Sequence, residues 1–194
     1  MKFESRVKGG VTQTLLKCLL DDAGYRVVPF GIEESIRELV CLTKEEYQSL
    51  NLPHVLRKMP DFFVTDKAMK KAWLVEVKFR KRWDEQTKLA IKSEISSQIK
   101  SWLPLLLVVF VQEPVYESKR NTPYSYIGAA ELVADADGDL AIVTSGSGMV
   151  KWEHANWGDF PKIQAVFPDL RSRYREKTIE STMRAIQSLP LDIE

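Results

Sequence analysis

Two carboxylates and a lysine occur close together on apolar segments in the first half of the chain. Asp61 begins the segment 61–65, and Glu76 and Lys78 lie within the segment 73–80. Alternate side chains of a β-strand share a face, so Glu76 and Lys78 should lie side by side. Burying such a pair in a sheet is costly unless a partner or a metal ion offsets the cost. The pattern therefore indicates a chemical site on a strand.

The same strand has a second face that is suited to a protein core. Its alternate residues are Trp73, Val75, Val77 and Phe79. We expect 61–65 and 72–80 to pair as a hairpin, because a lysine-rich turn separates them. Asp61 and Glu76 would then approach each other, and two clustered carboxylates repel. A hard divalent cation bound through oxygen removes that repulsion.

Helix and strand signals indicate the elements that position these residues. Gly24 follows an apolar pattern of helical spacing and predicts the end of a helix. Thr43 and Glu46 have the capping-box pattern, so a helix should begin at Thr43. The expected elements are a helix over 11–23, a strand over 25–30, an insertion over 31–59, strands over 61–65 and 72–80, a helix over 84–102, and a strand over 105–112.

The order of these elements predicts an α/β fold. A helix between two strands implies a crossover, and therefore a mixed sheet with helices packed on it. The remaining residues contain a strand signal over 140–144 and a long charged helix over about 170–189. We expect 1–112 to form the core. We expect 113–194 to be an α+β elaboration packed on that core, not an independent domain.

The motif and its context resemble a known family. Pro60-Asp61, followed after fourteen residues by Glu76-Val77-Lys78, resembles the signature of the PD-(D/E)XK nuclease superfamily, which includes restriction enzymes, Holliday-junction resolvases and RecB-like nucleases. The resemblance covers roughly 9–112. It implies a restriction-endonuclease-like α-β-β-β-α-β core, with the two acids and the lysine on the second and third strands.

The resemblance also implies an activity, a cofactor and roles for the site residues. Asp61, Glu76 and the backbone carbonyl of Val77 would hold Mg²⁺ or Mn²⁺, and the reaction would be hydrolysis of a phosphodiester. Lys78 would orient or help to deprotonate the attacking water and offset charge on phosphorus. The expected substrate and partner is DNA, with RNA and a homodimeric assembly left open. An unrelated α/β scaffold acting through protein contacts is the alternative outside this superfamily.

Two further positions bear on the resemblance. Gln98, with Trp102 one turn later on the helix expected over 84–102, resembles a glutamine and aromatic pair of RecB-like members. The alternative is a solvent-facing glutamine and a core tryptophan. The first helix of these nucleases often presents a glutamate to the metal, whereas the matching position here is Gln13. This departure puts a second metal site in doubt, leaves Glu4 or Glu33 as substitutes, and keeps open a weakly active or inactive nucleic-acid-binding protein on the same fold.

Basic residues surround the motif in the sequence. Seven lysines and arginines and a single acid lie between Lys67 and Arg82. The residues expected to contact flanking phosphates are Lys70, Lys71, Arg80, Lys81 and Arg82. Such contacts give position but no base identity, so little sequence preference is expected. The alternative is a solvated basic loop.

Composition sets the class of the protein. The chain has 194 residues and 44% hydrophobic residues, which fits a globular fold with a substantial core. The apolar run 103–111 is too short to cross a bilayer, and the chain begins without an apolar signal core. Two cysteines and two histidines give neither a disulfide framework nor zinc-ligand spacing. We expect a cytoplasmic protein without membrane contact.

Overall fold

The computed structural model describes residues 3–32, 36, 39, 41–117, 122–146, 148–171 and 173–188. The α-helices in this part of the chain are α1 (Phe3–Asp22), α3 (Lys44–Ser49), α4 (Glu85–Ile95), α5 (Ile163–Val166) and α6 (Arg173–Gln187). The 3₁₀ turns are η2 (Leu56–Lys58), η4 (Pro123–Ser125), η5 (Trp157–Asp159) and η6 (Pro168–Arg171).

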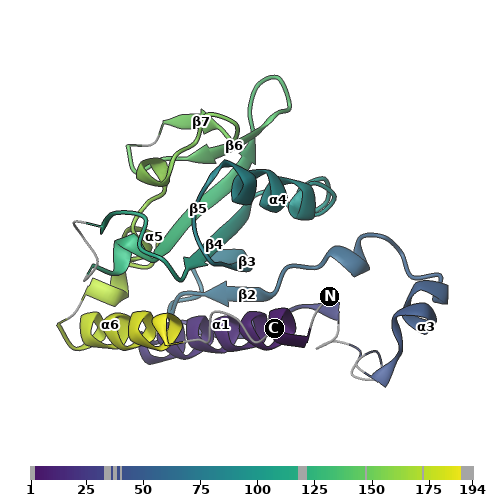
Figure 1. Ribbon diagram of the computed structural model, residues 1–194, viewed down its shortest axis with the longest axis horizontal. Coiled ribbons are helices and arrows are strands. Elements are labelled where there is room, and N and C mark those ends of the chain that lie inside the picture. Colours follow the sequence, from purple (N-terminus) through teal and green to yellow (C-terminus); the bar gives the residue numbers. More distant parts are fainter. Residues whose placement is uncertain are drawn as a thin grey trace.

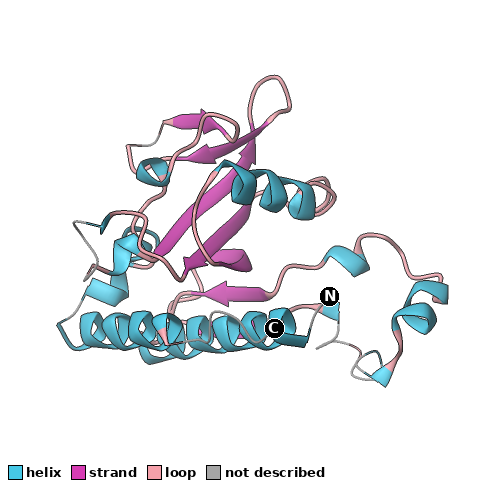
Figure 2. Cartoon of the chain, in the orientation of Figure 1, coloured by secondary structure: helices cyan, strands magenta, loops and turns pink. Residues whose placement is uncertain are grey.

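A mixed sheet of seven strands forms the centre of the molecule (Figures 1 and 2). The strands are β1 (Arg26–Pro29), β2 (Phe62–Thr65), β3 (Ala72–Arg80), β4 (Leu105–Val111), β5 (Ile127–Ala134), β6 (Leu140–Val143) and β7 (Met149–Lys151). They lie side by side in chain order. The β3–β4 pair is parallel because α4 crosses between these strands, and the other neighbouring pairs are antiparallel. The expected α/β class and mixed sheet are therefore confirmed.

Helices cover both faces of this sheet. On one face α1 and α6 lie side by side (Figure 1), and Leu16 and Ile179 are fully buried in the core beneath them. On the other face Ile91 and Ile95 of α4 pack with alternate residues of β4 and with an aromatic group that includes Trp152. Strands β5 to β7 continue the sheet beyond β4, so both halves of the chain share these two cores.

The first helix is longer than expected and ends where expected. It begins at Phe3 and runs through Gly9 and Gly10, although glycine disfavours a helix interior. At its end Gly24 has a φ of 85°, and the Tyr25 amide donates to the Leu20 carbonyl over 3.0 Å. This arrangement is the glycine-terminated cap that the sequence predicts.

Strand β3 has the predicted bounds and the predicted two faces. Val75 and Val77 are buried in the core beneath α1, with Trp73 packed against it. Leu74, one position away, packs in the core beneath α4. Glu76 follows this alternation and lies on the α4 side of the sheet.

The helix after β3 is shorter than expected. It begins where expected, with the Thr87 amide donating to the Asp84 carboxylate at its amino-terminal cap, but it ends at Ile95 and not near residue 102. Ser96 donates its hydroxyl hydrogen to the Ser93 carbonyl, and such side-chain bonds compete with helix propagation. The chain continues to residue 101 as hydrogen-bonded turns.

The expected insertion projects away from the sheet beside the amino-terminal end of α1 (Figure 1). Its α3 helix begins at the predicted capping box: the Glu46 amide donates to Thr43, and the Thr43 amide donates to the Glu46 carboxylate. In the part of the chain that the structure describes, no helix has the length and apolar character needed to cross a membrane.

Candidate active site

Asp61 and Glu76 lie close together at the end of the β2–β3 hairpin where β2 begins. Phe62 pairs with Val75 in the antiparallel β2–β3 ladder, and both side chains are buried in the core beneath α1. Glu76 follows Val75, so its side chain lies on the opposite face of the sheet. Asp61 directly precedes β2, and its carboxylate contacts Gln13 of α1 and the Val77 amide. The charges of Glu76 and Lys78 both act on Asp61. The structure thus brings the two carboxylates and Lys78 together, as the strand pattern predicts.

The Asp61 carboxylate is held by two donors from different elements. Gln13 on α1 donates its side-chain N–H to Oδ1 over 2.7 Å, and the Val77 amide donates to Oδ2 over 2.7 Å. Burial, and after it the charge of Glu76, raises the pKa of Asp61 to about 7 despite these hydrogen bonds. The carboxyl group is therefore poised to exchange a proton near neutral pH.

The Glu76 carboxylate is buried, with 6% of the residue exposed, and both of its oxygens are occupied. Oε1 accepts from Lys78 Nζ and Oε2 accepts from the Gln98 side chain, each over 2.7 Å. A second carboxylate, Glu94 of α4, lies 3.5 Å from Lys78. Burial alone would lower the pKa of Lys78, but the Glu76, Asp61 and Glu94 charges outweigh it and raise that pKa. Lys78 is therefore held as an ammonium group.

The oxygen atoms at this position suit a hard divalent cation. Asp61 and Glu76 supply carboxylates, which such cations prefer. The Val77 N–H points at Asp61, and in an extended strand the N–H and C=O of one residue point to the same side. The Val77 carbonyl therefore points toward Asp61 as well. Asp61, Glu76 and the Val77 carbonyl could therefore act as ligands to such a cation.

A cleft of about 490 Å³ opens beside Asp61. One wall is α1, with Gly10, Gln13 and Lys17, and the other comes from the projecting segment, with Tyr47 and Arg57. The volume lies within the range of pockets that hold small ligands, roughly 300–1,000 Å³. A ligand can therefore reach Asp61 from this side.

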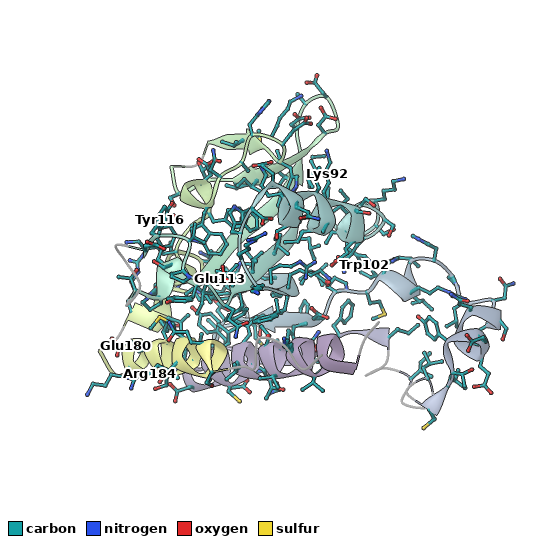
Figure 3. The ribbon with its side chains drawn as sticks, viewed as in Figure 1. Lys92, Trp102, Glu113, Tyr116, Glu180 and Arg184 are labelled. Carbon is teal, nitrogen blue, oxygen red and sulfur yellow. The ribbon has the colours of Figure 1, made fainter. Side chains whose placement is uncertain are left out.

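The structure also places the other residues that bear on the resemblance. Gln98 lies beyond the end of α4 in the following turns, yet it is buried against Glu76 and not solvent-facing. Trp102 donates its indole N–H to the Val55 carbonyl over 3.3 Å, so it packs where α4 and the projecting segment approach each other (Figure 3). Glu33 and the side chain of Glu4 lie outside the described residues.

The basic residues around the motif do not form one patch. Lys70 and Lys71 lie in the β2–β3 turn, whereas Lys81 and Arg82 follow the other end of β3. A rise of about 3.3 Å per residue places these groups roughly 30 Å apart. Arg80 pairs with Glu94 over 2.6 Å, and Arg82 pairs with Asp84 over 2.7 Å. Lys70, Lys71 and Lys81 form no ion pair with any described residue.

Sequence reasoning missed Glu94 and the two residues of the far cleft wall, Tyr47 and Arg57. Glu94 reaches Lys78 and Arg80 because α4 crosses over the sheet. Tyr47 and Arg57 meet because the projecting segment folds back on itself. Each contact depends on the packing of separate segments, so no local pattern indicates it.

A separate acidic cluster lies in the turn between β5 and β6. Asp135, Asp137 and Asp139 could hold a cation, but the Lys151 ammonium group lies 2.9–3.3 Å from all three carboxylates. These carboxylates raise the pKa of Lys151, so its charge is firmly retained. Lys151 offsets one of the three negative charges, and the cluster lies apart from the Asp61–Glu76 pair.

Comparison with protein-family models, with curated proteins and with solved structures gave no match.

Proposed function

We propose that this chain is a metal-dependent nuclease that hydrolyses phosphodiester bonds in DNA. The observation that carries the proposal is the position of Asp61 opposite Glu76, with Lys78 beside Glu76 on the same face of β3. A carboxylate pair with an adjacent ammonium group suits a reaction in which negative charge develops on phosphorus. The cleft gives a substrate access to Asp61.

The order of the elements supports a restriction-endonuclease-like core. The chain runs α1, β1, β2, β3, α4 and β4 around the site, which follows the α-β-β-β-α-β order of the PD-(D/E)XK nucleases. Asp61 directly precedes the second strand and Glu76 and Lys78 lie on the third, as in the pattern of that superfamily. We therefore propose the restriction-endonuclease-like fold together with the nuclease chemistry.

Asp61, Glu76 and the Val77 carbonyl would hold Mg²⁺ or Mn²⁺. When bound, such an ion polarises the scissile phosphate and lowers the pKa of a bound water. Asp61 must lose its proton to serve as a ligand, and its raised pKa makes metal affinity increase through neutral pH. Glu76 must give up part of its bonding to Lys78 and Gln98.

The chain's own side chains have distinct roles in this scheme. Lys78 remains protonated, because its pKa is raised, so it stabilises charge on the reacting phosphate in preference to removing a proton from water. Gln13 orients the Asp61 carboxylate and Gln98 orients the Glu76 carboxylate through their amide N–H groups. These two hydrogen bonds hold the ligand oxygens at fixed positions before a cation arrives.

A second candidate function is nucleic-acid binding with weak or absent catalysis. It is favoured by Gln13, which occupies the first-helix position where the superfamily often has a glutamate. Gln13 contributes an N–H to Asp61 and no negative charge. A single cation with two carboxylates gives less charge stabilisation than a pair of cations would.

A cleavage assay separates the two functions. Plasmid, single-stranded and branched DNA, and RNA of the same sequence, are incubated with Mg²⁺, with Mn²⁺ or with EDTA. Metal-dependent cleavage that is lost in Asp61→Asn and Glu76→Gln, but kept in the exposed-turn control Asp137→Asn, supports the nuclease. Metal-independent binding without cleavage supports the second candidate, and cleavage of RNA alone corrects the substrate.

A further inference from the structure

Arg57 is a half-buried cation in the wall of the cleft that also contains Asp61. Its guanidinium group lies over the Tyr47 ring, 5.1 Å from the ring centroid, and donates to the Leu50 carbonyl. It forms no ion pair with any described residue. A partly desolvated guanidinium group retains several N–H donors whose natural partner is an anion.

The shape of the cleft leaves space beside this cation. Across from Arg57, the α1 wall carries Gly10, and a Cβ built there would meet nothing within 4 Å. Lys17 on the same wall is paired with Asp21, so Arg57 is the cation available to a ligand among the residues described as lining this cleft. An occupant therefore meets Arg57 and the flat Tyr47 ring on one side and open space on the other.

A nucleotide combines the two chemical features that this wall can bind. Its phosphate matches the N–H edge of a guanidinium group, and its base is a flat aromatic surface that stacks on tyrosine or arginine. A base in a duplex is already stacked and paired, so it can reach an aromatic wall only after it leaves the helix. The cleft therefore favours a strand whose bases are unpaired.

We propose, resting on the nuclease function above, that this cleft binds an unpaired nucleotide next to the scissile phosphate. Arg57 binds its phosphate, and the Arg57–Tyr47 stack contacts its base. The substrate class is then single-stranded DNA, or a frayed or branched end, and blunt duplex is disfavoured. Tyr47 and Arg57 are specificity-determining residues and have no part in the bond-breaking step.

The test measures binding apart from cleavage, with Ca²⁺ in place of Mg²⁺. A fluorescent oligonucleotide is used as a single strand and as a blunt duplex, and Kd is measured by anisotropy. We expect the wild type to prefer the single strand, and Arg57→Gln and Tyr47→Ala each to weaken single-strand binding by about tenfold. Tyr47→Phe keeps the ring and should stay close to wild type.

The matched control for the arginine is Arg184→Gln. Arg184 lies on α6, at the side of the molecule away from the projecting segment (Figure 3), and its partner is Glu180 on the same helix. Melting temperatures show whether each variant is folded, and Arg57→Gln still tests the site if Tyr47→Ala unfolds the segment. Arg184→Gln should bind both substrates as the wild type does.

The outcomes for this site and for the nuclease are distinguishable. Equal binding of single strand and duplex, or folded Arg57→Gln with unchanged single-strand affinity, overturns the inference even if the wild type cleaves DNA. If the wild type cleaves nothing with Mg²⁺ and Arg57→Gln loses single-strand binding, the nucleotide site is supported and the nuclease function is contradicted. A wild type that binds no oligonucleotide overturns the inference as well.

Discussion

Gln13 and Asp61 are joined by a hydrogen bond of 2.7 Å, although 48 positions of the chain separate them. The amide N–H of Gln13 reaches Asp61 from α1, across the end of the sheet. A neutral donor beside a carboxylate whose pKa is raised stabilises the ionised form without adding charge. The first helix thereby contributes orientation to the site and no third negative charge.

Replacing Gln13 with glutamate should make the protein more dependent on divalent cations. Three carboxylates would then meet with Lys78 as the nearest compensating charge, so Gln13→Glu should lower the melting temperature in EDTA at about pH 8. Mg²⁺ or Mn²⁺ should raise it by more than in the wild type, because the added acid is a further ligand. The exposed Gln86 of α4 gives the control Gln86→Glu. Equal metal-induced shifts in wild type and Gln13→Glu would contradict this role of α1.

The pKa of Asp61 predicts a pH dependence of folding stability. Burial and the Glu76 charge raise this pKa from 3.8 to about 7. Between these values the folded state holds a proton that the unfolded chain has lost, so the contribution of Asp61 to stability decreases as pH rises. Asp61→Asn has no such proton. When the pH rises from about 5 to about 8 in EDTA, the free energy of unfolding of Asp61→Asn should increase by roughly 1–3 kcal/mol relative to that of the wild type.

Urea unfolding at both pH values measures this difference directly. Asp137→Asn, in the exposed β5–β6 turn, serves as the control for removing one carboxylate elsewhere. Parallel pH profiles of wild type and Asp61→Asn would show that Asp61 titrates near its ordinary pKa, and that the carboxylate pair is less strongly coupled than the geometry indicates.

Metal binding at the carboxylate pair should stabilise the wild type. A ligand that binds only the folded state adds about 2.7 kcal/mol at a concentration of 100 Kd. We expect Mg²⁺ to raise the melting temperature of the wild type and to have no effect on folded Asp61→Asn. The cluster of Asp135, Asp137 and Asp139 around Lys151 offers an internal check, since Asp137→Asn should keep the full metal-induced rise in melting temperature. An equal shift in wild type and Asp61→Asn would place the bound ion elsewhere.

The parts of the fold that follow from local patterns could be predicted from the sequence. Alternation along β3 placed Glu76 and Lys78 on one face, and Thr43 marked the start of α3. In contrast, β5 gave no signal, because Gly128 and the alanines after it have low strand propensity and are buried on both faces. The packing explains that glycine: a Cβ on Gly128 would lie 3.0 Å from the Trp157 ring.

The missed parts of the site depend on long-range packing. The expected length of α4 was wrong because the serines after Ile95 favour turns, yet Gln98 still reaches Glu76 from those turns. The basic run in the sequence suggested one patch, but the nine residues of β3 separate its two ends. The spacing of residues along a strand shows reliably which side chains share a face. It does not show which charged residues form ion pairs.

Lys78 and the outer basic residues should differ in what they contribute to the reaction. Lys78 lies beside Glu76, so Lys78→Met should lower the cleavage rate by about 10²–10³-fold while affinity for DNA stays near the wild-type value.

Lys70, Lys71 and Lys81 lie toward the two ends of β3, where only distant phosphates could reach them. Neutralising one that contacts phosphate should weaken binding to every sequence alike and reduce the salt dependence of log Kd by about one unit. Single-turnover kinetics and salt titrations on both sets of variants measure these effects. Wild-type cleavage by folded Lys78→Met would exclude Lys78 from the chemistry, and an unchanged salt slope in the lysine variants would leave those residues as a solvated surface.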